Sequence, residues 1–163
     1  MKNDSSIDFG KMSEYESGYT RLKYIGAGAM GETYLVQDKS DGKFYVAKYQ
    51  LTTADSMASI VADEWQITNR LSHENIVSTQ ASFFDPNQNQ LIMLLEFCEF
   101  RDLDDQMKLQ SVWSEPVIWN VLAQIARGLK HTHDYDVMHL DLKPQNIFVK
   151  GDGTLKIGDF GIC

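Results

Sequence analysis

The chain has 163 residues, of which 43% are hydrophobic, and this is enough for one globular core of ordinary size. Its net charge of −8 argues against a nucleic-acid partner, because an acidic surface repels phosphate backbones. Two widely separated cysteines, no apolar run of membrane-spanning length and no signal-peptide core predict a reduced protein of the cytoplasm or nucleus, without membrane association.

Residues 1–18 are polar and lack periodicity, which predicts a disordered N-terminal tail. From Tyr19 apolar residues alternate with polar ones, which predicts a strand. This strand leads into a G-x-G-x-x-G sequence formed by Gly26, Gly28 and Gly31. A β-rich segment follows, whereas dinucleotide-binding folds place a helix there. The glycines therefore predict a strand–loop–strand hairpin whose backbone N–H groups can approach phosphate oxygens.

A further strand is predicted over residues 43–50, where Lys48 follows the apolar residues Val46 and Ala47. A lysine in a strand can bind phosphate or can lie at a solvated edge. Residues 52–71 predict a helix with one apolar face, and this helix carries Glu64. An exposed helical glutamate is the alternative interpretation of that residue.

Two strands are predicted next, over residues 77–84 and 90–97, on either side of a polar turn. A short helix over residues 102–108 and a long helix over residues 114–134 follow. The long helix begins with a capping serine and a proline in its first turn. Its apolar residues have helical spacing, which predicts a stripe facing the core. The stripe consists of Val117, Val121, Leu122, Ile125, Ala126 and Leu129.

A carboxylate, an ammonium and a carboxamide follow this helix within a short segment, at Asp141, Lys143 and Asn146. Such a set suits phosphoryl transfer: the carboxylate orients a hydroxyl, the ammonium neutralises phosphate charge and the carboxamide holds a metal ion. Further along, Asp159 begins an Asp-Phe-Gly sequence, which offers a second carboxylate for a metal ion.

Residues 139–146 and the Asp-Phe-Gly sequence resemble the catalytic loop and the metal loop of the eukaryotic protein kinases. The glycine hairpin and residues 45–48 resemble the phosphate-covering loop and the lysine strand of that family, at the family's usual separation. The resemblance implies an α+β, protein-kinase-like fold with a β-rich N-lobe that contains one long helix, and a partial, mainly helical C-lobe. The implied division is residues 1–18 as a tail, 19–98 as N-lobe and hinge, and 99–163 as an incomplete C-lobe.

The resemblance also implies ATP and Mg²⁺ as cofactors. Asp141 and Lys143 are the expected catalytic residues, and Asn146 and Asp159 are the expected Mg²⁺ ligands. The other expected site residues contact the nucleotide or position a residue that does. These are Gly26, Gly28, Gly31, Thr33, Val46, Lys48, Glu64, Glu96, Cys98, Asp102 and Phe148.

Within this set, the resemblance gives Lys48 the α- and β-phosphates of ATP, with Glu64 as its ion-pair partner. The backbone carbonyl of Glu96 and the backbone N–H of Cys98 would read the edge of adenine. Three further residues would lie over the adenine, near the ribose and beneath the adenine, respectively: Thr33, Asp102 and Phe148.

Two features of the loop bear on the subfamily. Lys143 is typical of the Ser/Thr form of the loop. Leu140, which stands where most kinases have arginine, and the Asn-Ile-Phe sequence at Asn146 resemble the Wee-type kinases, which phosphorylate cyclin-dependent kinases. A protein substrate is therefore expected, with a cyclin-dependent kinase as the candidate, and a NIMA-related or generic Ser/Thr kinase is the alternative.

The sequence ends two residues after the glycine of the Asp-Phe-Gly sequence, which suggests a fragment or an incomplete gene model of a larger kinase. A nucleotide-binding scaffold without catalysis, or a truncated product that is inactive alone, are the alternatives to an active enzyme.

Two threonines, Thr68 and Thr79, also stand where active kinases stack apolar side chains. Their hydroxyls would weaken that packing unless they find hydrogen-bond partners.

Overall fold

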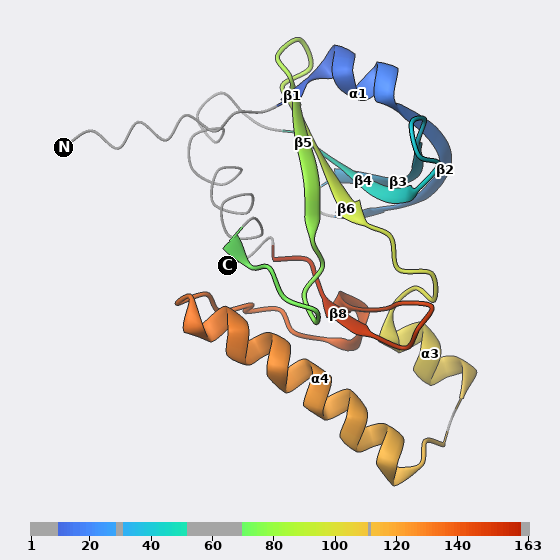
Figure 1. Cartoon of the computed structure of the whole chain (residues 1–163), viewed down its shortest axis with the longest axis vertical. Coiled ribbons are helices and arrows are strands. Elements are labelled where there is room, and N and C mark those ends of the chain that lie inside the picture. The colour runs from blue at the N-terminus through green and yellow to red at the C-terminus, as the bar shows by residue number, and fades with distance from the viewer. Residues whose placement is uncertain (1–9, 29–30, 52–69, 111, 161–163) are drawn as a thin grey trace, which may run out of the picture. The chain divides into compact units, whose positions relative to one another are not determined.

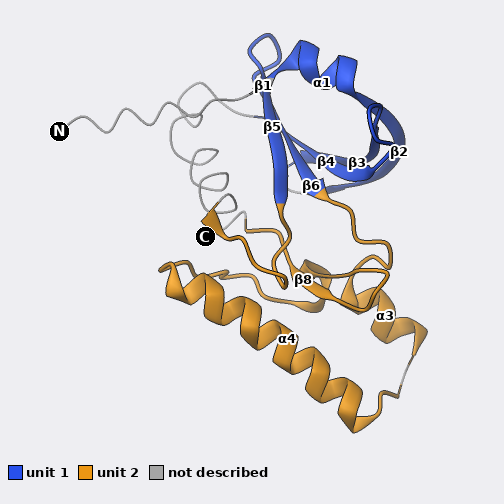
Figure 2. Ribbon diagram, viewed as in Figure 1, with its two compact units in different colours: residues 1–65, 79–95 blue, residues 66–78, 96–163 orange. Residues whose placement is uncertain are grey.

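The computed structural model describes residues 10–28, 31–51, 70–110 and 112–160. The chain divides into two compact units, residues 1–65 with 79–95, and residues 66–78 with 96–163 (Figure 2). Among the described residues, none of the helices combines the length and the apolar character needed to cross a membrane.

The first unit is built on a six-stranded sheet with the strand order β1-β5-β6-β4-β3-β2 (Figure 1). The strands are β1 (Gly10–Lys11), β2 (Tyr19–Gly28), β3 (Gly31–Asp38), β4 (Phe44–Leu51), β5 (Thr79–Asp85) and β6 (Gln90–Glu96). β2, β3 and β4 pair antiparallel, as do β5 and β6, whereas β1 runs parallel to β5. The strand predicted from Tyr19 begins there, and those predicted over residues 43–50, 77–84 and 90–97 are confirmed with ends shifted by no more than two residues.

An aromatic cluster forms the core of the first unit. It includes Tyr15 from helix α1 (Met12–Gly18), and its buried members are Tyr15, Val36, Ala47, Tyr49, Phe83, Ile92 and Leu94. The ring of Tyr15 lies 5.4 Å from that of Phe83, and its hydroxyl is hydrogen-bonded to the hydroxyl of Tyr49. Burial, the largest cause, and the Tyr49 hydrogen bond raise the pKa of the Tyr15 phenol above its ordinary value.

The prediction of a disordered tail through residue 18 is therefore wrong for residues 10–18. β1 pairs with β5 at one edge of the sheet, and α1 contributes a buried aromatic side chain to the core. The segment is polar overall, so its one buried ring gave no periodic signal in the sequence.

The second unit contains α3 (Leu103–Leu109), α4 (Glu115–Asp134), the 3₁₀ turn η1 (Pro144–Asn146) and a hairpin of β7 (Ile147–Val149) and β8 (Leu155–Ile157). Both helices predicted for this part of the chain are confirmed. α4 begins directly after Ser114, with a proline in its first turn, but the Ser114 side chain makes no capping hydrogen bond, so the prediction of a capping serine is wrong. The two apolar clusters of the unit bring together Leu71, Ile76, Ile157 and Phe160 in one case, and Leu103, Ile147, Val149 and Leu155 in the other.

The apolar stripe predicted along α4 is only partly buried. Val121, Ile125 and Leu129 pack against the two apolar clusters, whereas Val117 and Leu122 are about half exposed. The prediction that the whole stripe faces the core is therefore wrong. The fully buried positions of the helix are instead Gln124, Gly128 and Thr132.

Hydrogen bonds explain why a polar residue of α4 is buried. Gln124 Oε1 accepts from the Asn75 side-chain amide at 3.0 Å and from the backbone N–H of Leu155 at 2.8 Å. The same Asn75 amide donates to the Leu155 carbonyl at 2.9 Å, and Arg127 Nε lies 3.4 Å from Asn75 Oδ1. A buried network of this kind is stabilising only when its polar atoms have partners, as these do.

The segment before β5 belongs to the second unit because its backbone pairs with β8. Val77 N–H donates to the Ile157 carbonyl at 2.8 Å, and Ile157 N–H donates to the Asn75 carbonyl at 2.9 Å. The sequence placed this segment in the N-lobe, within residues 19–98.

The helix predicted over residues 52–71, which carries Glu64 and Thr68, lies outside the described residues except at its last two positions.

Gly128 allows α4 to lie close to Asn75 and Ile157. A Cβ at this position would lie 2.8 Å from Ile157 Cδ1 and 2.9 Å from the Asn75 carbonyl oxygen. We therefore expect Gly128→Val to lower the free energy of unfolding by about 1–3 kcal/mol, the usual cost of overpacking. Ala126→Val, at an exposed position of the same helix, should cost less than about 1 kcal/mol. Urea denaturation compares the two variants, and equal losses would contradict the close approach.

Candidate active site

Asp141 lies at the centre of a hydrogen-bonded group in the loop before and within η1. Lys143 Nζ lies 2.5 Å and Asn146 Nδ2 3.1 Å from Asp141 Oδ2, and Asn146 Nδ2 also donates to the Asp141 carbonyl at 2.9 Å. Both side-chain donors bind Oδ2. Among the described residues no donor contacts Oδ1, so this carboxylate oxygen is open to a hydrogen bond from a further donor. The hydrogen bond from Lys143, with a further one from Asn146, lowers the pKa of Asp141, so it is a carboxylate at neutral pH.

His139 ties this loop to the segment before Asp159. Its Nε2 lies 2.8 Å from the Gly158 carbonyl, and its buried ring lies 4.7 Å from the ring of Phe160. The Gly158 carbonyl can only accept, so the ring proton is assigned to Nε2, and Nδ1 accepts from the Asp141 N–H at 3.3 Å. His139 therefore positions the loop from both of its ring nitrogens.

The two predicted metal ligands are brought to neighbouring places in the second unit. Gly158 N–H donates to the Asn146 carbonyl at 2.9 Å, and Asp159 follows directly, with an exposed side chain and a φ of 62°. A carboxylate and a carboxamide offer the hard oxygen ligands that Mg²⁺ prefers. The donor set therefore fits Mg²⁺.

Leu140 stands where the resemblance to protein kinases implied an arginine. Its φ is 59° and 65% of the residue is exposed, so it fills no pocket among the described residues. Leucine rarely adopts a positive φ, but here the Asp141 N–H donates to the His139 carbonyl at 2.8 Å and closes a tight turn around Leu140.

The nucleotide residues expected in the second unit lie at the end of β6, on the segment after it and on β7. Asp102 and Phe148 form an antiparallel bridge, and Asp102 Oδ1 also caps α3 by accepting from the Asp105 N–H at 2.8 Å. The ring of Phe148 lies so close to Gly158 that a Cβ there would be 2.9 Å from Phe148 Cε2. The sequence predicted a place near the ribose for Asp102, but it did not predict that Asp102 caps α3.

Cys98, whose backbone N–H is expected to read adenine, has a buried side chain. Burial, with a further contribution from the nearby Glu96 carboxylate, raises the pKa of its thiol to about 12. Since the thiolate is the reactive form, we expect Cys98 to resist iodoacetamide at pH 8 in the folded chain and to react after addition of urea. Peptide mass spectrometry checks this, and equal labelling rates in both states would contradict the burial of Cys98.

In the first unit the three glycines lie along the β2–β3 hairpin, as predicted. Gly26 lies opposite Thr33, and Gly28 lies opposite Gly31. Gly31 has a φ of 135°, and a Cβ there would lie only 1.8 Å from the Tyr49 carbonyl oxygen. Glycine is therefore required at position 31 for the close approach of β3 to β4.

Lys48 lies on β4 directly opposite Thr33 on β3, and Val46 lies opposite Leu35. Lys48 is partly buried. The strand pairing thus brings together three of the residues expected at the nucleotide. Glu64, the expected ion-pair partner of Lys48, lies outside the described residues. The hydroxyl of Thr79, one of the two threonines expected to weaken the apolar stack, is buried without a hydrogen-bond partner in the described part of the chain.

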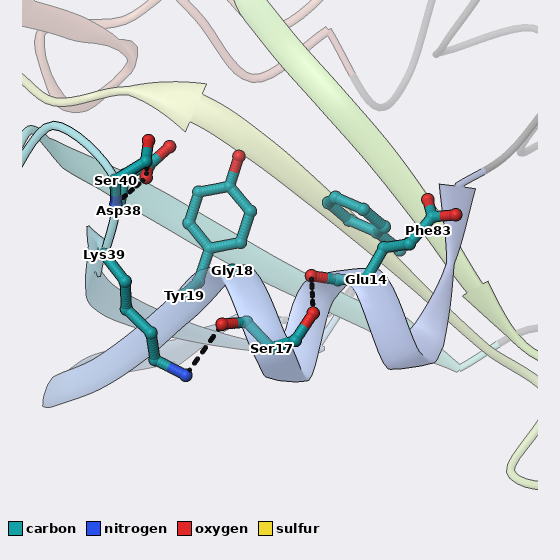
Figure 3. Close-up of a pocket in the computed structure, with 8 residues that line it drawn as sticks. All are labelled: Glu14, Ser17, Gly18, Tyr19, Asp38, Lys39, Ser40 and Phe83. Atoms are coloured by element: carbon teal, nitrogen blue, oxygen red, sulfur yellow. Dashed lines mark hydrogen bonds between the residues drawn. The ribbon is translucent and has the colours of Figure 1, made fainter.

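A cavity of about 470 Å³ lies beside α1 in the first unit (Figure 3). It is lined by Glu14, Ser17, Gly18, Tyr19, Asp38, Lys39, Ser40 and Phe83. The ammonium of Lys39 donates to the carbonyls of Glu16 and Ser17 at the end of α1, so it serves to cap this helix. The cavity contains none of the residues predicted to contact nucleotide.

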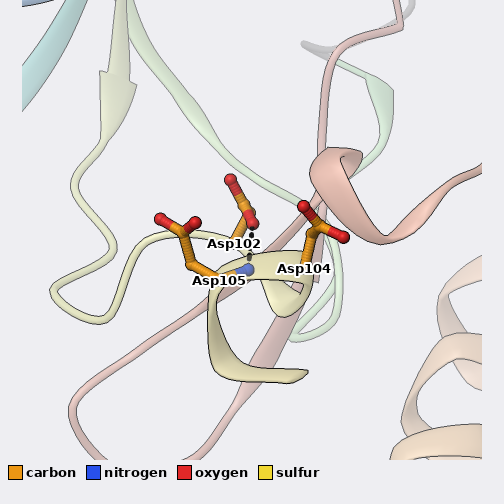
Figure 4. A group of neighbouring side chains, drawn as sticks. All are labelled: Asp102, Asp104 and Asp105. Atoms are coloured by element: carbon orange, nitrogen blue, oxygen red, sulfur yellow. Dashed lines mark hydrogen bonds between the residues drawn. The ribbon is translucent and has the colours of Figure 1, made fainter. Parts of the chain in front are cut away.

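Three aspartates also lie together at the start of α3 (Figure 4). Asp102 caps the helix, Asp104 pairs with Lys108 at 2.5 Å, and Asp105 pairs with Arg101 at 3.1 Å. Because each carboxylate already has a partner of its own within the helix or beside it, the cluster is explained without a metal ion.

Comparison with known proteins identifies the family. Residues 19–163 match the protein kinase domain. The chain is 35% identical over 149 residues to the serine/threonine-protein kinase Nek1 of Mus musculus, which covers 89% of the chain and 12% of Nek1. It is 37% identical over 143 residues to Nek5 of Mus musculus, covering 86% of the chain and 22% of Nek5.

The serine/threonine-protein kinase PLK2 of Mus musculus is 31% identical over 148 residues, which cover 89% of the chain and 21% of PLK2. The chain thus spans between about a tenth and a quarter of the length of these relatives. The expected protein-kinase-like fold with a β-rich N-lobe is confirmed, and the chain belongs to the protein kinase domain family.

Proposed function

We propose that this chain carries the nucleotide-binding and catalytic residues of a Ser/Thr protein kinase that transfers the γ-phosphate of ATP to a protein hydroxyl. The observation that supports this most strongly is the group of Asp141, Lys143 and Asn146, whose contacts leave one oxygen of a charged carboxylate open to a donor. The relatives named above are Ser/Thr kinases, which supports the same class of substrate. The proposed division is an N-lobe and hinge over residues 19–98 and part of a C-lobe over residues 99–163.

Each residue of the loop has a task in this proposal. Asp141 Oδ1 accepts a hydrogen bond from the substrate hydroxyl, orients its oxygen and takes up its proton as transfer proceeds. Lys143, held at Asp141, places a positive charge where the transferred group is negative. Asn146 and Asp159 would hold Mg²⁺. Bound Mg-ATP supplies the phosphoryl group and the metal charge that offsets its oxygens.

The first unit contributes the phosphate-binding residues of the proposal. The glycine hairpin offers backbone N–H groups without interfering side chains, and Lys48 offers an ammonium to the α- and β-phosphates. Val46 and Thr33 lie on the same two neighbouring strands, where they would cover adenine. In the second unit Glu96 and Cys98 would read the base edge, and Phe148 would lie beneath the ring.

Within the family we propose a NIMA-related kinase that acts on serine or threonine in the cytoplasm or nucleus. The identity to Nek1 and Nek5 and the Ser/Thr form of the loop at Lys143 support this alternative. The Wee-type interpretation, with a cyclin-dependent kinase as substrate, depends on Leu140 and the Asn-Ile-Phe sequence alone.

Titration with a fluorescent ATP analogue and Mg²⁺ tests the proposed nucleotide site. Lys48→Met and Asp159→Ala are each expected to weaken binding by about tenfold or more, equivalent to about 1.4 kcal/mol of binding free energy. Lys23→Met on β2 and Asp152→Ala in the β7–β8 turn remove the same side chains at exposed positions and should bind as the wild type does. Unchanged binding in Lys48→Met and Asp159→Ala would contradict the assignment.

A further inference from the structure

Glu96 and Lys156 form an ion pair that is largely withdrawn from solvent. Lys156 Nζ, on β8, lies 2.7 Å from Glu96 Oε1 at the end of β6, and the two side chains are 10% and 16% exposed, respectively. The same ammonium lies 3.5 Å from the carbonyl of Ile76. In the sequence these residues show no pairing signal, because 59 residues separate them along the chain.

Ser78 holds Glu96 at two more atoms. The Ser78 hydroxyl donates to Glu96 Oε2 at 2.8 Å, and the Glu96 N–H donates to the Ser78 carbonyl at 3.0 Å. Both carboxylate oxygens and the backbone N–H of Glu96 are therefore fixed. A residue held at three atoms has little freedom to rotate its own backbone carbonyl.

Hydrogen bonds hold the segment after Glu96 against the β7–β8 hairpin. Phe100 N–H donates to the Val149 carbonyl at 3.0 Å, and Val149 N–H donates to the Arg101 carbonyl at 2.8 Å. Gly151 N–H donates to Glu99 Oε2 at 2.7 Å. Cys98 therefore lies between two residues that are held in place: Glu96, by its ion pair with Lys156, and Phe100, by its backbone hydrogen bond to Val149.

Stability alone does not explain a buried ion pair. Removing two charges from water costs free energy, and apolar residues of similar volume often serve a fold equally well or better. In some proteins a buried polar or ionic group serves instead to fix one geometry. The geometry fixed here is that of the backbone around Glu96 and Cys98.

We infer that Lys156 is a positioning residue for recognition of the base: through Glu96 it fixes the backbone carbonyl of Glu96 and the N–H of Cys98. This inference rests on the proposed function, in which these two groups read the edge of adenine. Adenine presents an amino donor where guanine presents a carbonyl acceptor. A fixed backbone carbonyl therefore accepts from ATP and repels GTP, whereas a mobile one discriminates less.

The test is the ratio of the dissociation constants of GTP and ATP, measured by displacement of a fluorescent ATP analogue in the presence of Mg²⁺. Lys156→Met is expected to lower this ratio by about tenfold. The double variant Glu96→Gln with Lys156→Met buries no unpaired charge, and it is expected to lower the ratio as well. Lys130→Met, which breaks an ion pair to Asp134 with side chains 75% and 54% exposed, is the matched control and should leave the ratio unchanged.

The outcomes separate the inference from the proposed function. A general loss of stability would weaken ATP and GTP alike, so it leaves the ratio unchanged. An unchanged ratio in both variants, or a wild-type ratio restored in the double variant, would overturn the role of the ion pair while wild-type ATP binding stands. A wild-type chain that binds no ATP would overturn the proposed function and this inference with it.

Discussion

Asp141→Asn is expected to lower the rate of phosphate transfer by roughly 10²–10⁴-fold, the usual contribution of a positioned base. The substitution removes the negative charge that Lys143 and Asn146 now stabilise at Oδ2. It also replaces an acceptor by an amide, which cannot take up the hydroxyl proton. The shape of the side chain is kept, so the hydrogen bonds of His139 should still hold the loop.

The measurement is the initial rate of transfer from radiolabelled ATP to a protein substrate by the full-length product of the gene. Asp152→Asn makes the same chemical change at an exposed turn in the second unit and should keep the wild-type rate. If Asp141→Asn retained a rate within a few-fold of the wild type, Asp141 would not be the base of the reaction.

Tyr15→Ala is expected to lower the free energy of unfolding by about 3–5 kcal/mol, the usual cost of truncating a large buried aromatic side chain. The side chain connects α1 to the core of the first unit through its contacts with Phe83 and Tyr49. Tyr15→Phe keeps the ring and removes one hydrogen bond, so it should cost only about 1 kcal/mol.

Urea denaturation of these variants is compared with that of Tyr24→Ala, where the truncated ring is half exposed. The family match begins at residue 19, so Tyr15 lies outside it. A large cost for Tyr15→Ala alone would show that residues before the matched domain belong to the folded unit. Equal costs for Tyr15→Ala and Tyr24→Ala would contradict the packing of α1.

The sequence predicted the elements whose signals are local. Alternating residues predicted the strand from Tyr19, and the serine and proline at residues 114 and 116 predicted the start of α4. The short segment from Asp141 to Asn146 carries its chemistry in consecutive residues, so the composition of the loop could be read directly. The hydrogen bonds of Asp141 to Lys143 and Asn146 join residues close together along the chain, so they too arise locally.

The features that the sequence did not predict depend on partners far away along the chain. α1 is held by Tyr49 and Phe83, and the buried face of α4 is held by Asn75 and Leu155. A polar residue such as Gln124 looks exposed in a hydropathy pattern, because the pattern does not show that its amide will find partners. The pairing of Glu96 with Lys156 was missed for the same reason.

Phosphoamino-acid analysis of a mixed protein substrate tests the central claim most directly. The full-length product of the gene is incubated with Mg²⁺ and ATP labelled at the γ-phosphate, and Asp141→Asn is run beside it. The proposed Ser/Thr kinase predicts label on serine or threonine that depends on Asp141. Label on tyrosine alone would favour the Wee-type interpretation over the NIMA-related one, and no label with the wild-type protein would contradict the proposed activity.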